Sequence, residues 1–141
     1  MYIEALKFAY DKHKGQKRED GESYITHPIE VSLKYLPVYY NWKTRIVAIL
    51  HDTLEDTDTT MPELERKFGE EIMNSVSLLS NRKTEPYEEY IRRIKVCGDK
   101  EDIAVKIADL KHNLSTIDNI KDESRRKKLK DRYEKALKVL E

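Results

Sequence analysis

Residues 46–56 have the sequence IVAILHDTLED, in which an apolar run ends at a histidine and an aspartate, and two further carboxylates follow one turn later. The run predicts a buried helix, which we expect over about residues 42–54. In that helix, His51, Asp52, Glu55 and Asp56 would lie within one arc and face one cavity. Because burying four ionisable groups is costly without a cation or a substrate, we interpret them as residues of a functional site rather than as packing residues of the core.

The rest of the sequence repeats its apolar residues at helical spacing, and no alternating strand pattern interrupts it. Glycine, proline and capping residues separate the segments. We predict an all-α helical bundle that forms a single domain over residues 1–141, with the polar segment 80–86 as a mobile rim. The predicted helices cover residues 2–14, 28–36, 42–54, 60–68, 70–79, 87–96, 99–114 and 123–140.

The composition narrows the class of partner. Lys and Arg together number 27, as do Asp and Glu, so the formal net charge is zero and no domain-wide basic field can hold nucleic acid. The single cysteine, Cys97, cannot form an internal disulfide, which indicates a reducing compartment. Neither a membrane-spanning stretch nor a signal-peptide pattern is present. We expect a cytoplasmic protein with a small-molecule partner, without nucleic acid or membrane; its oligomeric state stays open.

Two histidines and two aspartates form a candidate metal site. His27 ends a polar loop just before Pro28, His51 and Asp52 follow the apolar run, and Asp109 interrupts the apolar segment KIADL. A mixed nitrogen and oxygen set suits Mn, Fe, Co, Ni or Zn and is unlike a thiolate-based structural zinc site. Four protein ligands leave positions open on a six-coordinate ion, an arrangement that favours hydrolysis of phosphate esters.

Glu55 and Asp56 are the candidates for orienting or deprotonating the attacking water. Each candidate also has an ordinary structural interpretation. His27 could cap a helix, the acidic pair could belong to a turn at a helix end, and Asp109 could pair with Lys106 or Lys111. The joint occurrence of the four candidate ligands at helix ends or in apolar surroundings favours the metal site.

Four blocks of sequence resemble the hydrolase domain of the Rel/Spo alarmone enzymes, within the HD superfamily of metal-dependent phosphohydrolases. The blocks are HKGQKREDGESYITHPIEV at residues 13–31, AILHDTLEDTDTT at 48–60, FGEEI at 68–72 and VKIADLKHN at 105–113. The resemblance implies an HD-domain helical bundle that holds one Mn²⁺. It also implies that the substrate is guanosine tetra- or pentaphosphate, from which the enzyme removes the 3′-pyrophosphate to give GDP or GTP.

The same resemblance implies roles for individual residues. It assigns the metal to His27, His51, Asp52 and Asp109, in agreement with the set above, and the attacking water to Glu55 and Asp56. It places Arg18 against the guanine and Asn113 and Thr116 near the ribose and phosphates. Lys17 lies beside Arg18 in the sequence and is a candidate for neutralising the polyphosphate.

The chain departs from the family pattern at several positions. Glu19 and Asp20 are acidic where contacts on the base side are expected, and Leu110 and Lys111 shift a positive charge by one position around the helix, which predicts rearranged phosphate contacts. His112 has no metal role in the family, so we predict a structural or supporting role for it.

Two alternatives to this function stay open. In the first, the chain is an HD phosphohydrolase of another nucleotide: a 5′-nucleotidase, a nucleoside triphosphate hydrolase or a 2′-phosphatase of NADPH-like nucleotides. In the second, it is a non-catalytic nucleotide-binding module, which the intact pair Glu55 and Asp56 argues against. His13, near the end of the first helix, is predicted to be a surface residue.

Overall fold

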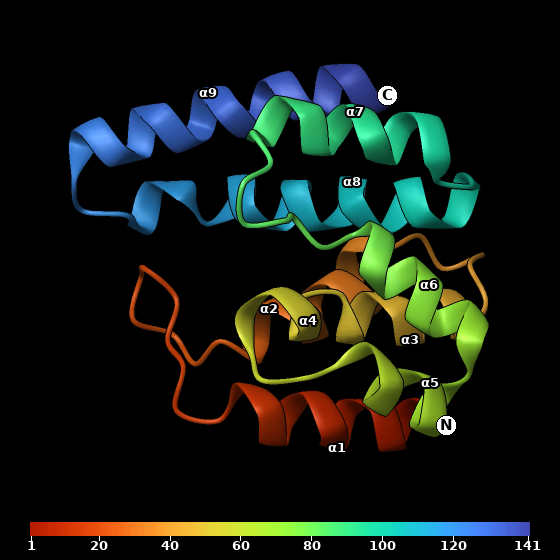
Figure 1. The fold of residues 1–141 in the computed structure, drawn as a ribbon. Coiled ribbons are helices and arrows are strands. Elements are labelled where there is room, and N and C mark those ends of the chain that lie inside the picture. Colours follow the sequence, from red (N-terminus) through yellow and green to blue (C-terminus); the bar gives the residue numbers. More distant parts are fainter.

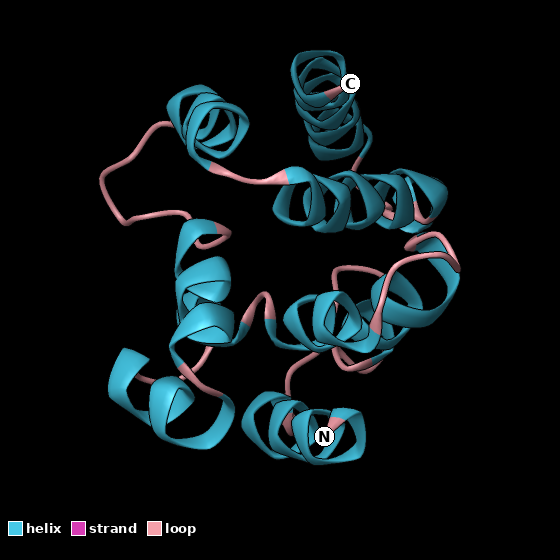
Figure 2. Cartoon of the chain, turned by 90° about the vertical axis from the view of Figure 1, so that its right-hand side faces the viewer, coloured by secondary structure: helices cyan, strands magenta, loops and turns pink.

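The computed structural model describes residues 1–141 and contains helices and loops but no strands, which confirms the all-α prediction (Figure 2). No helix is long and apolar enough to cross a membrane. A π-helical turn over Val31–Tyr35 and a 3₁₀ turn over Ile117–Asn119 accompany the α-helices. These are α1 (Tyr2–His13), α2 (Thr26–Glu30), α3 (Trp42–Leu50), α4 (Thr53–Asp56), α5 (Met61–Phe68), α6 (Glu70–Leu78), α7 (Tyr87–Cys97), α8 (Lys100–Ser115) and α9 (Glu123–Leu140).

The helices stack in layers, with α1 at one outer edge, α3 and α8 in the middle, and α7 and α9 at the other edge (Figure 1). Helix α8 packs against α3, α9 and the π-helical turn. The apolar run of α3 is buried throughout and belongs to a single cluster of core side chains, to which α8 contributes Val105, Ala108 and Leu110. Helix α8, which carries Asp109, and helix α3, which leads directly into His51 and Asp52, are therefore held at the centre of the bundle.

Local sequence signals account for several helix ends. The side chain of Asn41 accepts a hydrogen bond from the Thr44 N–H at the start of α3. Asp99 and Asp102 form a reciprocal capping box at the start of α8. Gly69 separates α5 from α6 at a φ of 94°, a conformation that a side chain disfavours. These positions lie where the sequence predicted helix boundaries.

The prediction of one helix over residues 42–54 is wrong. Helix α3 ends at Leu50, His51 and Asp52 form a turn, and α4 begins at Thr53. Asp52 has φ −98° and ψ −2°, and the Thr53 hydroxyl donates to the Leu50 carbonyl at 2.7 Å. The angular argument based on a continuous helix therefore fails, because the turn rather than helical spacing sets the directions of the two side chains.

Candidate functional site

The four predicted metal ligands converge at one point between α2, the turn after α3, and α8. The Nε2 atom of His27 lies 2.7 Å from Asp109 Oδ1 and 3.6 Å from Asp52 Oδ2. The Nε2 atom of His51 lies 3.1 Å from Asp52 Oδ2 and 3.5 Å from Asp109 Oδ1. Neighbouring ligands on an octahedral ion with bonds near 2.1 Å are about 3 Å apart. The ligand atoms of His27, His51 and Asp52 all lie within 4.8 Å of one another, so their spacing suits one divalent cation, and Asp109 lies beside the two histidines.

The other ring nitrogen of each histidine is held by a protein partner. The Nδ1 atom of His51 lies 2.6 Å from the Ala48 carbonyl and donates to it, so Nε2 carries no proton when the ring is neutral. That Nε2 is buried without a hydrogen-bond partner. The Nδ1 atom of His27 lies 2.6 Å from the Nδ1 atom of His112. The two imidazoles are thus oriented as metal ligands usually are, and the residues present fit a cation.

His112 takes part in the site through His27 rather than through a metal. Burial, and then the electrostatic effect of the neighbouring His27 ring, lowers the pKa of His112 to about 4. A neutral His112 can accept a hydrogen bond from His27 Nδ1, which leaves Nε2 of His27 facing the carboxylates. This contact matches the supporting role predicted for His112.

The carboxylates of the cluster are ionised. Burial opposes the charge of Asp109, but the charges of Lys106 and His51 hold the pKa of Asp109 well below its usual range. Burial likewise opposes the charge of Asp52, and His51 lowers the pKa of Asp52. Two anions in a buried cluster are a strong attraction for a divalent cation.

Lys106 is the buried partner of Asp109. Its Nζ atom donates to Asp109 Oδ2 at 2.6 Å and lies 5.0 Å from the ring centroid of Tyr90. The pairing that we considered as an alternative to a metal therefore exists, but it uses Oδ2 and leaves Asp109 Oδ1 facing the histidines. The pairing and the metal site are compatible.

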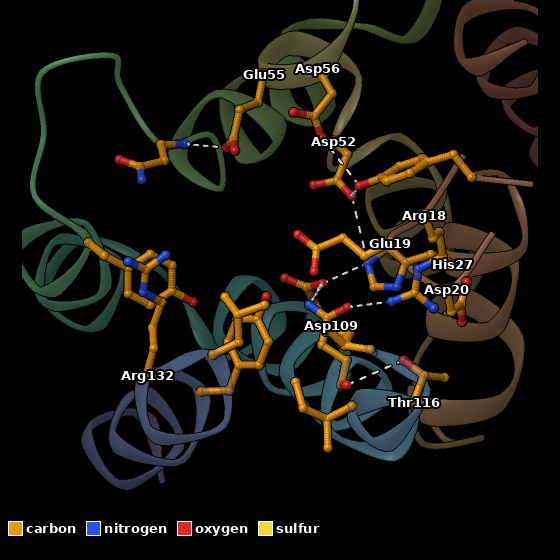
Figure 3. Close-up of a pocket in the computed structure, with 18 of the residues that line it drawn as sticks. Arg18, Glu19, Asp20, His27, Asp52, Glu55, Asp56, Asp109, Thr116 and Arg132 are labelled. Carbon is orange, nitrogen blue, oxygen red and sulfur yellow. Dashed lines mark hydrogen bonds and ion pairs between the residues drawn. The ribbon is translucent and has the colours of Figure 1, made fainter. Parts of the chain in front are cut away.

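Glu55 and Asp56 lie on α4 at the edge of the cluster and face the same pocket (Figure 3). The backbone N–H of Asn81 donates to Glu55 Oε1 at 2.7 Å. Burial, followed by the negative charges of Asp52 and Glu55, raises the pKa of Asp56 to about 7. A carboxylate with that pKa is suited to accept a proton from water near neutral pH.

Tyr24 connects the ligand set with this acidic pair, a role that we did not predict. Its hydroxyl is 2.6 Å from Asp52 Oδ2 and 3.2 Å from Asp56 Oδ2, and it can donate to either. The ring of His13 lies 4.8 Å from the ring of Tyr24, and His13 is buried, so the prediction of a surface residue is wrong. The signal available for Tyr24 was its place three residues before His27.

A cavity of about 370 Å³ opens beside the cluster, and the four predicted substrate contacts, Lys17, Arg18, Asn113 and Thr116, all line it. Arg18 donates to the Asn113 side chain at 2.8 Å. Arg18 comes from the loop before α2 and Asn113 from α8, so the fold joins two segments that are far apart in the sequence (Figure 3).

Two departures from the family pattern have structural explanations. Glu19 and Asp20 both line the cavity, and Glu19 forms an ion pair with Arg125 at 2.7 Å, so the charge of Glu19 is compensated within the chain. Leu110 is fully buried and Lys111 is exposed, and neither lines the cavity. Neither side chain is therefore placed to contact a ligand in the cavity, and a rearrangement of the phosphate contacts stays a prediction.

The sequence matches the HD domain family over residues 5–136. The chain belongs to the HD domain family. This HD domain is 38% identical over 136 residues to a guanosine-3′,5′-bis(diphosphate) 3′-pyrophosphohydrolase of Aquifex aeolicus, and the match covers 92% of the chain and 20% of that protein. It is 34% identical over 138 residues to the bifunctional (p)ppGpp synthase/hydrolase SpoT of Escherichia coli, with coverage of 89% and 20%. The chain thus spans about a fifth of the length of these relatives.

A solved structure of a metazoan ortholog of SpoT, described as hydrolysing ppGpp, superposes on this HD domain with a TM-score of 0.87. The two sequences are 25% identical, and the match covers 99% of this chain and 84% of the other. The similarity therefore extends over the whole bundle, including α7 to α9, which close the cavity.

Proposed function

We propose that this HD domain hydrolyses guanosine tetra- or pentaphosphate at the 3′ position, releases pyrophosphate and leaves GDP or GTP. The convergence of two histidines and two aspartates beside Glu55 and Asp56 carries the proposal. The relatives named above, which include 3′-pyrophosphohydrolases, support this choice of substrate.

In this proposal His27, His51, Asp52 and Asp109 hold a divalent cation, with Mn²⁺ as the resident metal. Such a cation supplies Lewis acidity toward a phosphoryl oxygen and makes water more acidic. The nitrogen and oxygen donors suit Mn²⁺, although they also bind other first-row metals.

In this proposal Glu55 and Asp56 orient and deprotonate the attacking water. As water attacks the phosphorus bonded to the 3′ oxygen, Asp56 takes the proton that the water loses, while Glu55, fixed by the Asn81 N–H, orients the water. The bond between phosphorus and the 3′ oxygen breaks, the 3′ oxygen takes up a proton from solvent water to become a hydroxyl, and pyrophosphate departs. The Tyr24 hydroxyl, which can donate to Asp52 or to Asp56, holds these two carboxylates in place relative to each other.

The other end of the substrate lies against the loop before α2. Arg18 contacts the guanine, and Asn113 and Thr116 contact the ribose and phosphates, with Lys17 adding positive charge at the mouth. The apolar side chains of Ile117, Ile120 and Leu129 also line the cavity and offer a surface for the base. We propose that the protein acts on this small molecule in the cytoplasm, where its exposed thiol stays reduced.

The test is to incubate Mn²⁺-loaded protein with guanosine tetraphosphate and to identify the products by chromatography and ³¹P NMR. We expect GDP and pyrophosphate. His51→Ala should lose bound metal and turnover, whereas Glu55→Gln should keep the metal and lose turnover. Glu65→Gln, an exposed change on α5, is the matched control and should behave as wild type. A Glu55→Gln variant with normal turnover would refute the role of Glu55.

A panel of nucleotides separates this activity from the alternatives. Release of orthophosphate from a nucleoside monophosphate, a triphosphate or NADPH at a higher kcat/KM would assign another phosphohydrolase. Tight binding of guanosine tetraphosphate without any product, in protein shown to contain metal, would assign a non-catalytic module.

A further inference from the structure

The cavity continues past the metal cluster, away from Arg18, to a region between α7 and α9 that contains Arg132 (Figure 3). Three arginines line the cavity. Arg18 is bonded to Asn113 and Arg125 to Glu19, but Arg132 makes no ion pair or hydrogen bond. Its guanidinium lies 4.9 Å from the ring centroid of Tyr87. A guanidinium stacked on an aromatic ring keeps its hydrogen-bond donors available for a ligand.

Two polar atoms of the cavity lining also lack partners. The hydroxyl of Tyr87 and the side-chain oxygen of Asn81 are buried without a hydrogen bond, although both residues line the cavity. Buried polar groups are normally satisfied, so the unsatisfied hydroxyl of Tyr87, the residue on which the Arg132 guanidinium stacks, points to a polar ligand. The stretch 80–86, expected to form a rim, contributes Asn81 to this region.

The positive charge of Arg132 favours an anionic ligand in the region between α7 and α9. The Nζ atom of Lys106 lies 5.9 Å from the same Tyr87 ring, so two cations contact one tyrosine. Lys106 is neutralised by Asp109, whereas the charge of Arg132 is not neutralised by any side chain. A guanidinium and a phenol are suitable donors for phosphate oxygens.

We propose that Arg132 and Tyr87 bind the distal phosphate of the 3′-pyrophosphate, and that this subsite makes the pocket selective for 3′-diphosphates over 3′-monophosphates. The inference rests on the proposed function. If the scissile phosphorus lies at the metal cluster and the guanosine lies on the Arg18 side, the second phosphate extends away from the nucleoside, toward Arg132. Arg132 is then a specificity-determining residue for the group that departs.

Three guanosine substrates test the assignment: the 3′,5′-bis(diphosphate), the 5′-diphosphate 3′-monophosphate, and the 3′-diphosphate without 5′ phosphates. For Arg132→Met we expect KM to rise roughly tenfold or more for both 3′-diphosphates and to stay unchanged for the 3′-monophosphate. Arg132→Lys should retain part of the preference. Arg92→Met, an exposed and unpaired arginine on α7, is the control and should leave all three values unchanged. An equal loss on all three substrates, or a loss that follows the 5′-diphosphate, would overturn the proposal.

Direct binding separates this inference from the proposed function. Calorimetry at a fixed free Mn²⁺ concentration, with inorganic pyrophosphate and orthophosphate as the probes, does not depend on turnover. We expect wild type to prefer pyrophosphate and Arg132→Met to bind it roughly tenfold more weakly, with orthophosphate unchanged. If guanosine tetraphosphate is not hydrolysed but this preference is present and depends on Arg132, the proposed function fails and the subsite stands. If the preference is absent, the subsite fails even where hydrolysis is observed.

Discussion

Replacing Lys106 with methionine removes the ammonium group that neutralises Asp109 inside the bundle. The two groups are 2.6 Å apart, and only 7% of Lys106 and 4% of Asp109 is exposed. Removing one partner of a buried ion pair costs about 3 to 5 kcal/mol, because the other charge stays buried and loses its main counter-charge, which for Asp109 is Lys106. We expect Lys106→Met to lower the free energy of unfolding of the metal-free protein by that amount.

Bound Mn²⁺ should reduce the loss, because a cation beside Asp109 replaces part of the missing charge. Saturation at about 100 times the dissociation constant stabilises a protein by about 2.7 kcal/mol, and the variant should gain at least about 1 kcal/mol more than wild type. The assay is urea denaturation followed by circular dichroism, with EDTA and with Mn²⁺. Lys135→Met removes an exposed pair with Asp131 and should cost less than about 1 kcal/mol in both conditions. A Lys106→Met variant no less stable than this control in EDTA, or equally destabilised with and without Mn²⁺, would refute the reasoning.

Three further changes test neighbouring features. Tyr24→Phe removes a hydroxyl that can donate to Asp52 and to Asp56, so we expect a loss of about 10- to 100-fold in Mn²⁺ affinity or in kcat. The two quantities are measured separately, and wild-type values for both would contradict this role of Tyr24. Arg93 donates two hydrogen bonds to the Glu85 carboxylate and lowers the pKa of Glu85, so Glu85→Gln should lower the free energy of unfolding by about 1 kcal/mol at pH 7. Urea titrations should show this difference between variant and wild type fading below about pH 4, because Glu85 is then protonated in the wild type and the charged pair is lost. Asp99→Ala removes the cap of α8 and should cost about 1 kcal/mol by thermal denaturation; an unchanged Tm would contradict the capping role.

Much of the fold could be predicted because its signals are local. Caps and glycines mark helix ends directly, as Asp99 does for α8 and Gly69 does between α5 and α6. The candidate ligands could be chosen because ionisable side chains in apolar surroundings, such as Asp109, conflict with ordinary packing.

What could not be predicted depends on the path of the backbone in space. No glycine or proline in the sequence marks the turn at His51 and Asp52. Contacts between distant segments, such as Tyr24 with Asp52, arise only when α2 docks against the end of α3. The same holds for Arg132, which stacks on Tyr87 across two helices and has the sequence appearance of one more solvated charge.

The turn between α3 and α4 has a consequence for assembly. Because His51 and Asp52 are consecutive, one short segment supplies half of the ligand set, and the other half comes from His27 and Asp109, which are 82 residues apart. The cluster can close only after the N-terminal helices and α8 have docked together, since neither part contains all four donors. If these four residues hold the cation, as proposed, metal binding would require completed folding: a chain cut before α8 should retain the consecutive pair yet bind Mn²⁺ weakly, and the ion would join the two ends of the sequence late in folding.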